Sequence, residues 1–245
     1  MPQPKTNNVS QSQQGTAPEG EHDSRLAFLF DLDGTLVDSV YRQVQAWQEA
    51  FLKKDLPLPA WRIHRRIGMS GGMLVRALLR ESGRRMSEEE MKQIEDLHGE
   101  TYGRLVADVK LLPGARELLE ELSRLKRPWA IVTSSKPEKA EHALKMLGVG
   151  PDANVVTRAE VSRAKPEPDP YYVGAQRLNM SIRDCVVVGD SVWDLLSAQR
   201  ARALGVGFLT GGSGRDELER AGAYRVYEDP ADLLRHLDEL GVNTE

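Results

Sequence analysis

The chain has 245 residues, of which 40% are hydrophobic, and carries 33 lysines and arginines against 37 aspartates and glutamates. This length can bury a sizeable core in one or two domains, and the formal net charge of −4 excludes the basic character typical of proteins that bind nucleic acids or anionic membranes. No apolar run approaches membrane-spanning length and no apolar segment follows Met1–Lys5, so we expect neither a membrane protein nor a secreted one.

Two further features of composition bear on location and order. The only cysteine, Cys185, lies in the apolar run Cys185–Val188, so it is predicted to be a small buried hydrophobic residue rather than a nucleophile. Residues 1–24 are rich in proline, glutamine, asparagine, serine and threonine, and they are predicted to form a disordered tail because they contain too few apolar side chains to pack. We therefore expect a cytoplasmic enzyme or binding protein.

The first predicted strand covers about residues 26–32 and ends in two carboxylates. Asp31 and Asp33 are two positions apart, so they lie on the same side if the backbone stays extended, and Gly34 permits a turn directly after them. Acidic residues at the carboxyl end of a strand lie where open parallel sheets bind ligands. Taken alone, this short pattern is equally typical of a surface turn.

The segment that follows is predicted to be entirely helical. Apolar residues recur at helical spacing after residue 39, and further helical patterns cover 60–67 and 72–82. Ser87 and Glu90 have the spacing of a capping box that opens another helix. Because no strand pattern appears between residues 40 and 108, we expect an all-helical insertion at 41–108, with the core domain at 25–40 and 109–245.

The remainder of the chain alternates between helical and strand patterns. Such alternation, with several unbroken valine and isoleucine runs, predicts an α/β fold with a parallel sheet covered on both faces. The predicted strands are 129–132, 153–157, 186–190, 205–209 and 224–227, and the predicted helices are 114–126, 137–147, 169–178, 191–203, 215–221 and 230–239.

Residues with useful chemistry follow four of the predicted strands. In a parallel sheet these positions lie along one edge, so the side chains are expected to gather there. Carboxylates, hydroxyl groups and one lysine together indicate a hard divalent cation such as Mg²⁺ and a phosphoryl group. The residues are Asp31, Asp33, Thr133, Ser134, Lys165, Asp190 and Asp194.

Four motifs that carry these residues resemble the haloacid dehalogenase superfamily. They read D-L-D-G-T-L-V-D-S at 31–39, T-S-S at 133–135, K-P-E-P-D at 165–169 and G-D-S-V-W-D at 189–194. The resemblance covers about residues 25–241 and is most specific to phosphoglycolate phosphatase and related small-molecule phosphatases with a helical cap. It implies a Rossmann-like parallel core, an inserted helical cap domain and a small phosphate ester as substrate.

The resemblance also implies a two-step phosphoryl transfer. Asp31 would attack the phosphorus atom and form an aspartyl-phosphate, and Asp33 would protonate the leaving alcohol and then deprotonate the hydrolytic water. Mg²⁺ would be held by the Asp31 carboxylate, the Asp33 main-chain carbonyl and Asp190, with Asp194 as a ligand or in the second shell. Asp194 could instead be an ordinary acid in the first turn of a helix.

The phosphate contacts are implied in the same way. Thr133, Ser134 and the amides around Gly34 would bind phosphoryl oxygens, and Lys165 would neutralise both the nucleophile and the phosphate. Two simpler interpretations remain open: Thr133 could cap the helix at 137–147, although Ser135 is better placed to do so, and Lys165 could be a solvated lysine in a loop.

The sequence also bears on the choice within the superfamily. Asp33 favours a phosphate ester, because dehalogenases and phosphonate-cleaving relatives lack an acid at this position. Sugar phosphomutases of the β-phosphoglucomutase type are the main alternative, but they carry a histidine where this chain has Gln43 and an arginine where it has Gly71. A non-catalytic binding protein on the same fold is the second alternative, which the intact Asp31 and Asp190 disfavour.

The predicted cap contains the loop Arg65–Gly72, which in relatives closes over the leaving group. Four arginines make this part of the cap basic, which would suit a second anionic group on the substrate. Each of them could equally belong to a solvated helix face. Arg66 is our candidate for substrate binding among Arg62, Arg65, Arg66 and Arg76.

Overall fold

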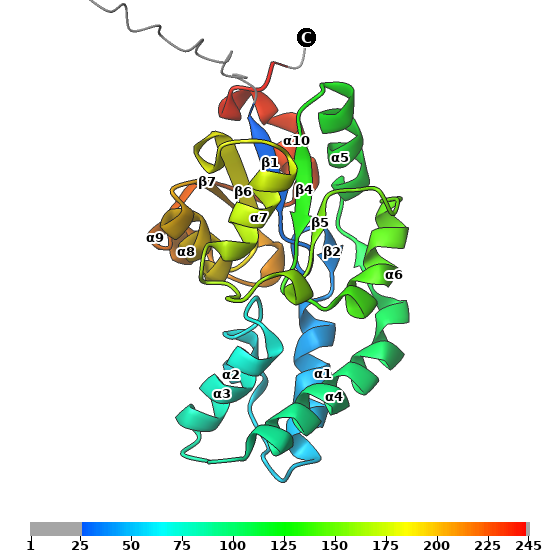
Figure 1. Ribbon diagram of the computed structural model, residues 1–245, viewed down its shortest axis with the longest axis vertical. Helices are drawn as coiled ribbons and strands as arrows, with labels where there is room; N and C mark the ends of the chain where they lie inside the picture. Colours follow the sequence, from blue (N-terminus) through cyan, green and yellow to red (C-terminus); the bar gives the residue numbers. More distant parts are fainter. Residues whose placement is uncertain (1–25, 244–245) are drawn as a thin grey trace, which may run out of the picture.

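The computed structural model describes residues 26–243, so the predicted tail lies outside the described residues. Its centre is a six-stranded parallel sheet in the order β5-β4-β1-β6-β7-β8 (Figure 1). The parallel α/β fold predicted from the alternating patterns is confirmed. The strands are β1 (Ala27–Phe30), β4 (Trp129–Val132), β5 (Val155–Val156), β6 (Cys185–Gly189), β7 (Leu204–Phe208) and β8 (Ala223–Tyr227).

Helices cover both faces of this sheet because alternate strand residues point to opposite sides. Phe28 and Phe30 belong to the apolar cluster shared with α5 (Ala115–Arg124), α6 (Pro137–Leu147) and α10 (Pro230–Arg235). Leu29 belongs to the cluster on the opposite face, which includes residues of α7 (Asp169–Arg177) and α8 (Val192–Ala201). The ninth helix, α9 (Arg215–Arg220), packs beside α8. Cys185 is free and buried in the cluster that contains Leu29, as predicted.

Four helices lie between the first and second strands of the main sheet, and we call residues Val40–Leu105 the helical insertion. Figure 1 shows them beyond the carboxyl ends of the strands. They enclose an apolar cluster of their own, which includes Trp47, Phe51 and Leu78. The capping box of Ser87 with Glu90 is present as predicted. The helices are α1 (Val40–Leu52), α2 (Ala60–His64), α3 (Gly71–Glu81) and α4 (Glu88–Leu105).

A short antiparallel ribbon joins the two ends of the helical insertion. Its strands are β2 (Val37–Asp38) and β3 (Lys110–Leu111), with Val37 opposite Leu111 and Asp38 opposite Lys110. The sequence did not predict this ribbon, because two residues are too few to show an alternating pattern. The chain therefore leaves the core and returns to it at a single place.

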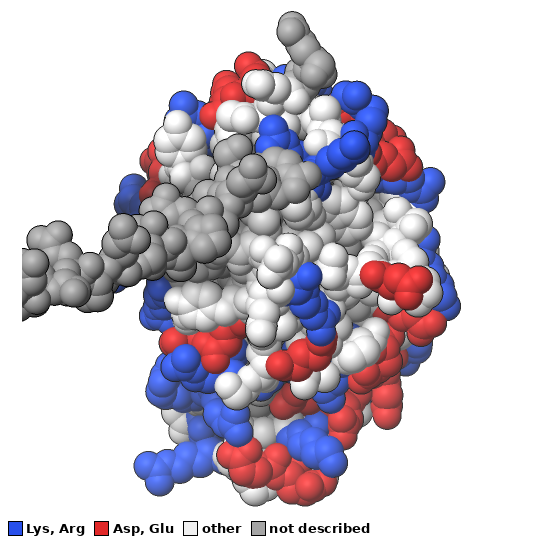
Figure 2. Space-filling view, turned by 45° about the horizontal axis from the view of Figure 1, so that its top comes forward, with Lys and Arg blue, Asp and Glu red and all other residues white. Residues whose placement is uncertain are grey.

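The surface of the described residues carries both signs of charge. On the face shown in Figure 2, basic and acidic side chains are interspersed rather than gathered by sign. No helix among residues 26–243 is long and apolar enough to span a bilayer.

Candidate active site

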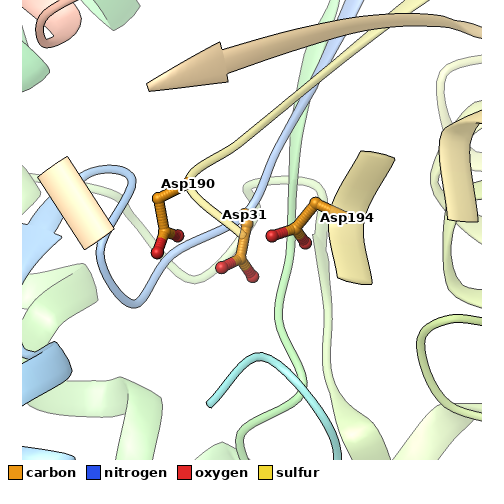
Figure 3. Close-up of side chains that lie close together, drawn as sticks. All are labelled: Asp31, Asp190 and Asp194. Atoms are coloured by element: carbon orange, nitrogen blue, oxygen red, sulfur yellow. The ribbon is translucent and has the colours of Figure 1, made fainter. Parts of the chain in front are cut away.

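Three buried carboxylates converge at the carboxyl edge of the sheet (Figure 3). Asp31 directly follows β1, Asp190 directly follows β6, and Asp194 lies in the first turn of α8. One oxygen from each side chain lies within 4.8 Å of the others, and each residue is 3% exposed or less. An all-oxygen donor set of this kind fits a hard divalent cation such as Mg²⁺.

The register of the two central strands brings the first two acids together. Phe30 of β1 pairs with Val188 of β6, and the Asp31 amide donates to the Val188 carbonyl at 2.9 Å. Asp31 and Asp190 therefore leave the sheet side by side. This confirms the expectation that side chains following neighbouring strands gather at one edge.

Two glycines leave room for Asp190. A Cβ atom on Gly211 would lie 1.7 Å from Asp190 Oδ2, and one on Gly34 would lie 2.5 Å from the same oxygen. Gly34 also has a φ of +85°, which glycine adopts without strain. The remaining Asp190 oxygen, Oδ1, accepts a hydrogen bond from Thr35 Oγ1 at 2.9 Å. The turn after Asp33 thus serves to position a carboxylate from another strand.

Lys165 is fully buried among these acids, so the interpretation as a solvated lysine is wrong. Its Nζ atom lies 2.6 Å from Asp31 Oδ1 and 2.8 Å from Asp194 Oδ1, and it donates to the Val132 carbonyl at 2.9 Å. Burial alone would lower the pKa of Lys165, but the carboxylates of Asp194 and Asp31 hold this pKa well above its usual value. The lysine is therefore a permanent cation beside Asp31.

Asp31 and Asp190 have raised pKa values because water is excluded from them. Burial raises the pKa of Asp31 to about 7, with a further increase from Asp194 and an opposing effect from Lys165. Burial, Asp194 and Asp31 likewise hold the pKa of Asp190 well above its usual value. A single ammonium group does not balance three carboxylates, so a bound divalent cation would stabilise the ionised site.

Asp194 has donors on both of its oxygens. Oδ1 accepts from Lys165 and from the Tyr171 hydroxyl at 2.9 Å, and Oδ2 accepts from the amide and hydroxyl of Ser191 in a capping box. Asp194 is therefore a first-turn acid that also holds Lys165. Sequence reasoning missed Tyr171, because a tyrosine on an apolar helix face looks like an ordinary core residue.

Asp33 is held by three donors from different parts of the chain. Its Oδ1 atom accepts from Ser39 Oγ at 2.6 Å and from Gln43 Nε2 at 3.3 Å, and its Oδ2 atom accepts from Ser135 Oγ at 2.8 Å. Ser135 does not cap α6, although it is better placed to do so than Thr133, because the N-cap position is Lys136 and this residue makes no side-chain cap. The Ser135 hydroxyl instead supports the second aspartate of the first motif.

The structure places Thr133 and Ser134 differently. Thr133 is buried and its Oγ1 atom accepts from the Ser135 amide at 3.0 Å, so it does not cap α6 either. Ser134 Oγ donates to the carbonyl of Gly68 in the helical insertion at 2.9 Å, and Ser134 lines the cavity described next. Ser134 therefore faces the cavity, whereas Thr133 is not among the lining residues.

A cavity of about 950 Å³ opens over Asp31 and Asp33, between the core and the helical insertion. Arg66 is not among its lining residues: it is ion-paired with Glu81, and its guanidinium lies 5.9 Å from the ring centre of Trp193. The lining comes from the loop and start of α3 (67–74 and Arg76), from α1 and α4 (Gln43, Trp47, Glu95 and His98), and from core segments 134–139, 158–159, 162–164 and Glu167.

Comparisons with known proteins agree with this geometry. The profile of the haloacid dehalogenase-like hydrolases matches residues 26–202. The chain belongs to this family. Hexitol phosphatase A of Escherichia coli is 35% identical over 71% of this chain and 78% of its own length, and the phosphoglycolate phosphatase of Haemophilus influenzae is 27% identical over 84% and 95%.

A solved structure gives the same result. The crystal structure of a hydrolase from Pseudomonas syringae is 48% identical and superposes with a TM-score of 0.86 over 88% of this chain and 99% of that one. With phosphatases among its relatives and the acidic cluster intact, the chain is a hydrolase of the phosphomonoesterase type.

Proposed function

We propose that this hydrolase is a Mg²⁺-dependent phosphatase that cleaves a small polyhydroxylated phosphomonoester through an aspartyl-phosphate on Asp31. The observation that carries the proposal is the buried contact of Lys165 with Asp31, at the base of a cavity that Asp33 also lines. A cytoplasmic location, predicted from composition, belongs to the same proposal.

The chain's own residues supply the two steps. The Asp31 carboxylate is the nucleophile, and the ammonium group of Lys165 keeps it oriented and screens its charge from the phosphate. Asp33, fixed by its three donors, protonates the leaving alkoxide and then takes a proton from the water that hydrolyses the aspartyl-phosphate. Amides around Gly34, together with Thr133 and Ser134, are the proposed ligands of the phosphoryl oxygens.

Asp31 and Asp190, with the main-chain carbonyl of Asp33, are the proposed ligands of Mg²⁺. The cation would offset negative charge on the phosphoryl group as the transfer proceeds. We propose that Asp194 holds Lys165 rather than binding the cation directly, since both of its oxygens already accept hydrogen bonds from Lys165, Tyr171 and Ser191.

The cavity favours a neutral, hydroxyl-rich leaving group over one with a second negative charge. Its lining contains five basic and five acidic residues, so its charges balance, and its volume exceeds what a two-carbon acid requires. Mixed donors and acceptors match hydroxyl groups, which both donate and accept. The balanced residues are Arg76, Lys136, Lys139, Arg158 and Arg163 against Asp31, Asp33, Glu95, Glu138 and Glu167.

Ion pairs of three of the four arginines named from the sequence argue against a second anion site in the helical insertion. Arg65 is paired with Glu217, Arg66 with Glu81 and Arg76 with Glu88. The name of the Escherichia coli relative, a hexitol phosphatase, is consistent with a polyol leaving group for this chain too.

Phosphate release from a panel of phosphomonoesters tests the proposal. The panel contains hexitol phosphates, hexose phosphates, phosphoglycolate and a nucleoside monophosphate, each assayed with Mg²⁺ and again after EDTA. We expect release that EDTA abolishes, with kcat/KM highest on a hexitol or hexose phosphate.

Other outcomes would overturn parts of the proposal. A preference for phosphoglycolate would reject the polyol assignment while retaining the phosphatase. Conversion of β-glucose 1-phosphate to glucose 6-phosphate without phosphate release would identify a mutase, and the absence of turnover in either assay would favour a binding protein.

A further inference from the structure

A chain of hydrogen bonds runs from Asp33 through the helical insertion and back to the core. Gln43 Nε2 lies 3.3 Å from Asp33 Oδ1, His98 Nε2 lies 2.8 Å from Gln43 Oε1, and Lys139 Nζ lies 3.0 Å from His98 Nδ1. Gln43 belongs to α1 and His98 to α4, whereas Lys139 belongs to α6 of the core. From this arrangement we infer that Lys139 and His98 are positioning residues, which orient the Gln43 amide toward Asp33.

The direction of each hydrogen bond follows from the donor inventory of the side chains. A lysine ammonium group can only donate, so His98 Nδ1 must accept from Lys139. A neutral imidazole then carries its proton on Nε2 and donates to Gln43 Oε1. The Gln43 amide is thereby turned with its NH₂ group toward Asp33, where a carboxylate accepts.

The surroundings of His98 hold this arrangement in place. The histidine is 3% exposed, and its ring stacks on Trp47 with the ring centres 3.9 Å apart. Burial, together with the charge of Lys139, lowers the pKa of His98 well below its usual value, which favours the neutral ring that the geometry requires. Gln43 is also buried, so water competes little for its amide.

Without Lys139, only the Asp33 carboxylate at the other end of these hydrogen bonds would favour the His98 proton on Nε2. The imidazole could move its proton to Nδ1, and the Gln43 amide could then turn its oxygen toward the Asp33 carboxylate, which repels it. Two of these hydrogen bonds, Gln43 to Asp33 and Lys139 to His98, join the helical insertion to the core. Asp33 therefore has all of its donors only when the insertion is packed on the core. This inference rests on the proposed role of Asp33 as acid and base.

The first test is spectroscopic and does not need turnover. In ¹⁵N-edited NMR spectra of the protein, we expect His98 to be neutral with its proton on Nε2, and Lys139→Met to convert it to a mixture or to the Nδ1-protonated form. Lys145→Met is the matched control, because Lys145 lies on the same helix with an exposed side chain paired to Glu141. An unchanged His98 tautomer in Lys139→Met would overturn the inference.

The second test separates positioning from substrate binding. We expect Lys139→Met to lower kcat by about ten- to a hundredfold with KM within about twofold of the wild type, as for a misplaced catalytic group. Gln43→Met, which removes the amide with little change in shape, should give the same loss, and the double variant should lose no more than either single variant. Additive losses, or a raised KM with unchanged kcat, would overturn the inference.

The two tests also distinguish this inference from the proposed function. If the wild type released no phosphate from any ester, the proposed function would fail while the NMR result would still decide on the hydrogen-bond chain. A correct fold in each variant is verified by its circular dichroism spectrum and thermal midpoint.

Discussion

Lys165 joins two buried carboxylates, since its ammonium group contacts both Asp31 and Asp194. Removal of one partner from a buried ion pair leaves a charge without compensation and commonly costs about 3–5 kcal/mol. We predict that Lys165→Met lowers the free energy of unfolding by about 3 kcal/mol at pH 8. The loss should be smaller at pH 5, because Asp31, whose pKa is raised to about 7, is then protonated in the fold.

Denaturant unfolding at the two pH values measures this effect. Lys145→Met is the control, since Lys145 and Glu141 form an exposed pair whose removal should leave the unfolding midpoint unchanged. If the two variants lost equal stability at pH 8, the buried pair would not have the structural role assigned to it.

The proposed nucleophile permits a direct test. Asn has nearly the shape of Asp but cannot form an acyl phosphate, so Asp31→Asn should lower turnover by about 10⁴-fold or more while the circular dichroism spectrum stays the same. Asp38→Asn, a change at an exposed acid in the same motif, is the control and should retain activity. Activity of Asp31→Asn near that of the wild type would exclude the aspartyl-phosphate mechanism.

For single residues, the sequence predicted which acids lie together in the site, but not which side chains donate hydrogen bonds to them. Asp31 and Asp190 were expected together because each directly follows a strand of a parallel sheet. Ser135, Gln43 and Tyr171 were missed, since their partners lie far away in the sequence and their residue types suit a cap, a helix surface or a core equally well.

The close approach of the chain after β7 to Asp190 makes Gly211 a sensitive position. A Cβ atom there would lie 1.7 Å from Asp190 Oδ2, so Gly211→Ala must displace the carboxylate or the backbone. We predict a loss of Mg²⁺-dependent phosphatase activity of about tenfold or more, as for other misplaced catalytic groups. Activity titrated with Mg²⁺ measures this effect.

Gly103 offers a matched control for this change. It lies within α4, and a Cβ atom on it would have no neighbour within 4 Å. Gly103→Ala should therefore keep full activity and raise the thermal midpoint slightly, because alanine is the better helix former. If Gly211→Ala were as active as Gly103→Ala, the tight packing around Asp190 would have no functional consequence.

Element boundaries were predicted best where a residue enforces them. Helix α6 spans Pro137–Leu147 as expected, because proline starts it and Gly148 ends it in a left-handed conformation. Strand β5 has only Val155 and Val156, whereas 153–157 was predicted from its apolar residues. The helix predicted at 230–239 is shorter, because α10 ends at Arg235 and the backbone of His236 is not helical. A separate 3₁₀ turn, Leu237–Leu240, follows.

The acidic cluster also determines how the whole molecule should respond to Mg²⁺ and pH. The pKa of Asp31 in the metal-free fold is about 7, above its ordinary value, so below pH 7 a cation must displace a proton in order to bind. Asp190, the other proposed ligand, also has a raised pKa, so the apparent affinity for Mg²⁺ should fall as the pH drops, by up to about tenfold per pH unit for each carboxylate that must lose a proton.

Thermal unfolding with and without Mg²⁺ tests this expectation. The Mg²⁺-dependent gain in melting temperature should be small at pH 5 and large at pH 8. Asp31→Asn should show little gain at either pH. An equal gain for the wild type at both values would place the cation elsewhere on the protein.

The ribbon of β2 and β3 has a consequence for how this architecture can vary. Because Val37 pairs with Leu111 and Asp38 with Lys110, the two ends of the helical insertion are tied together where they meet the core. The distance between the two points where the insertion joins the core is therefore fixed by the ribbon, whatever the length of the insertion. A different set of helices could be grafted at this joint without moving Asp31 or Asp190, so the leaving-group pocket can diversify while the phosphoryl-transfer chemistry stays constant.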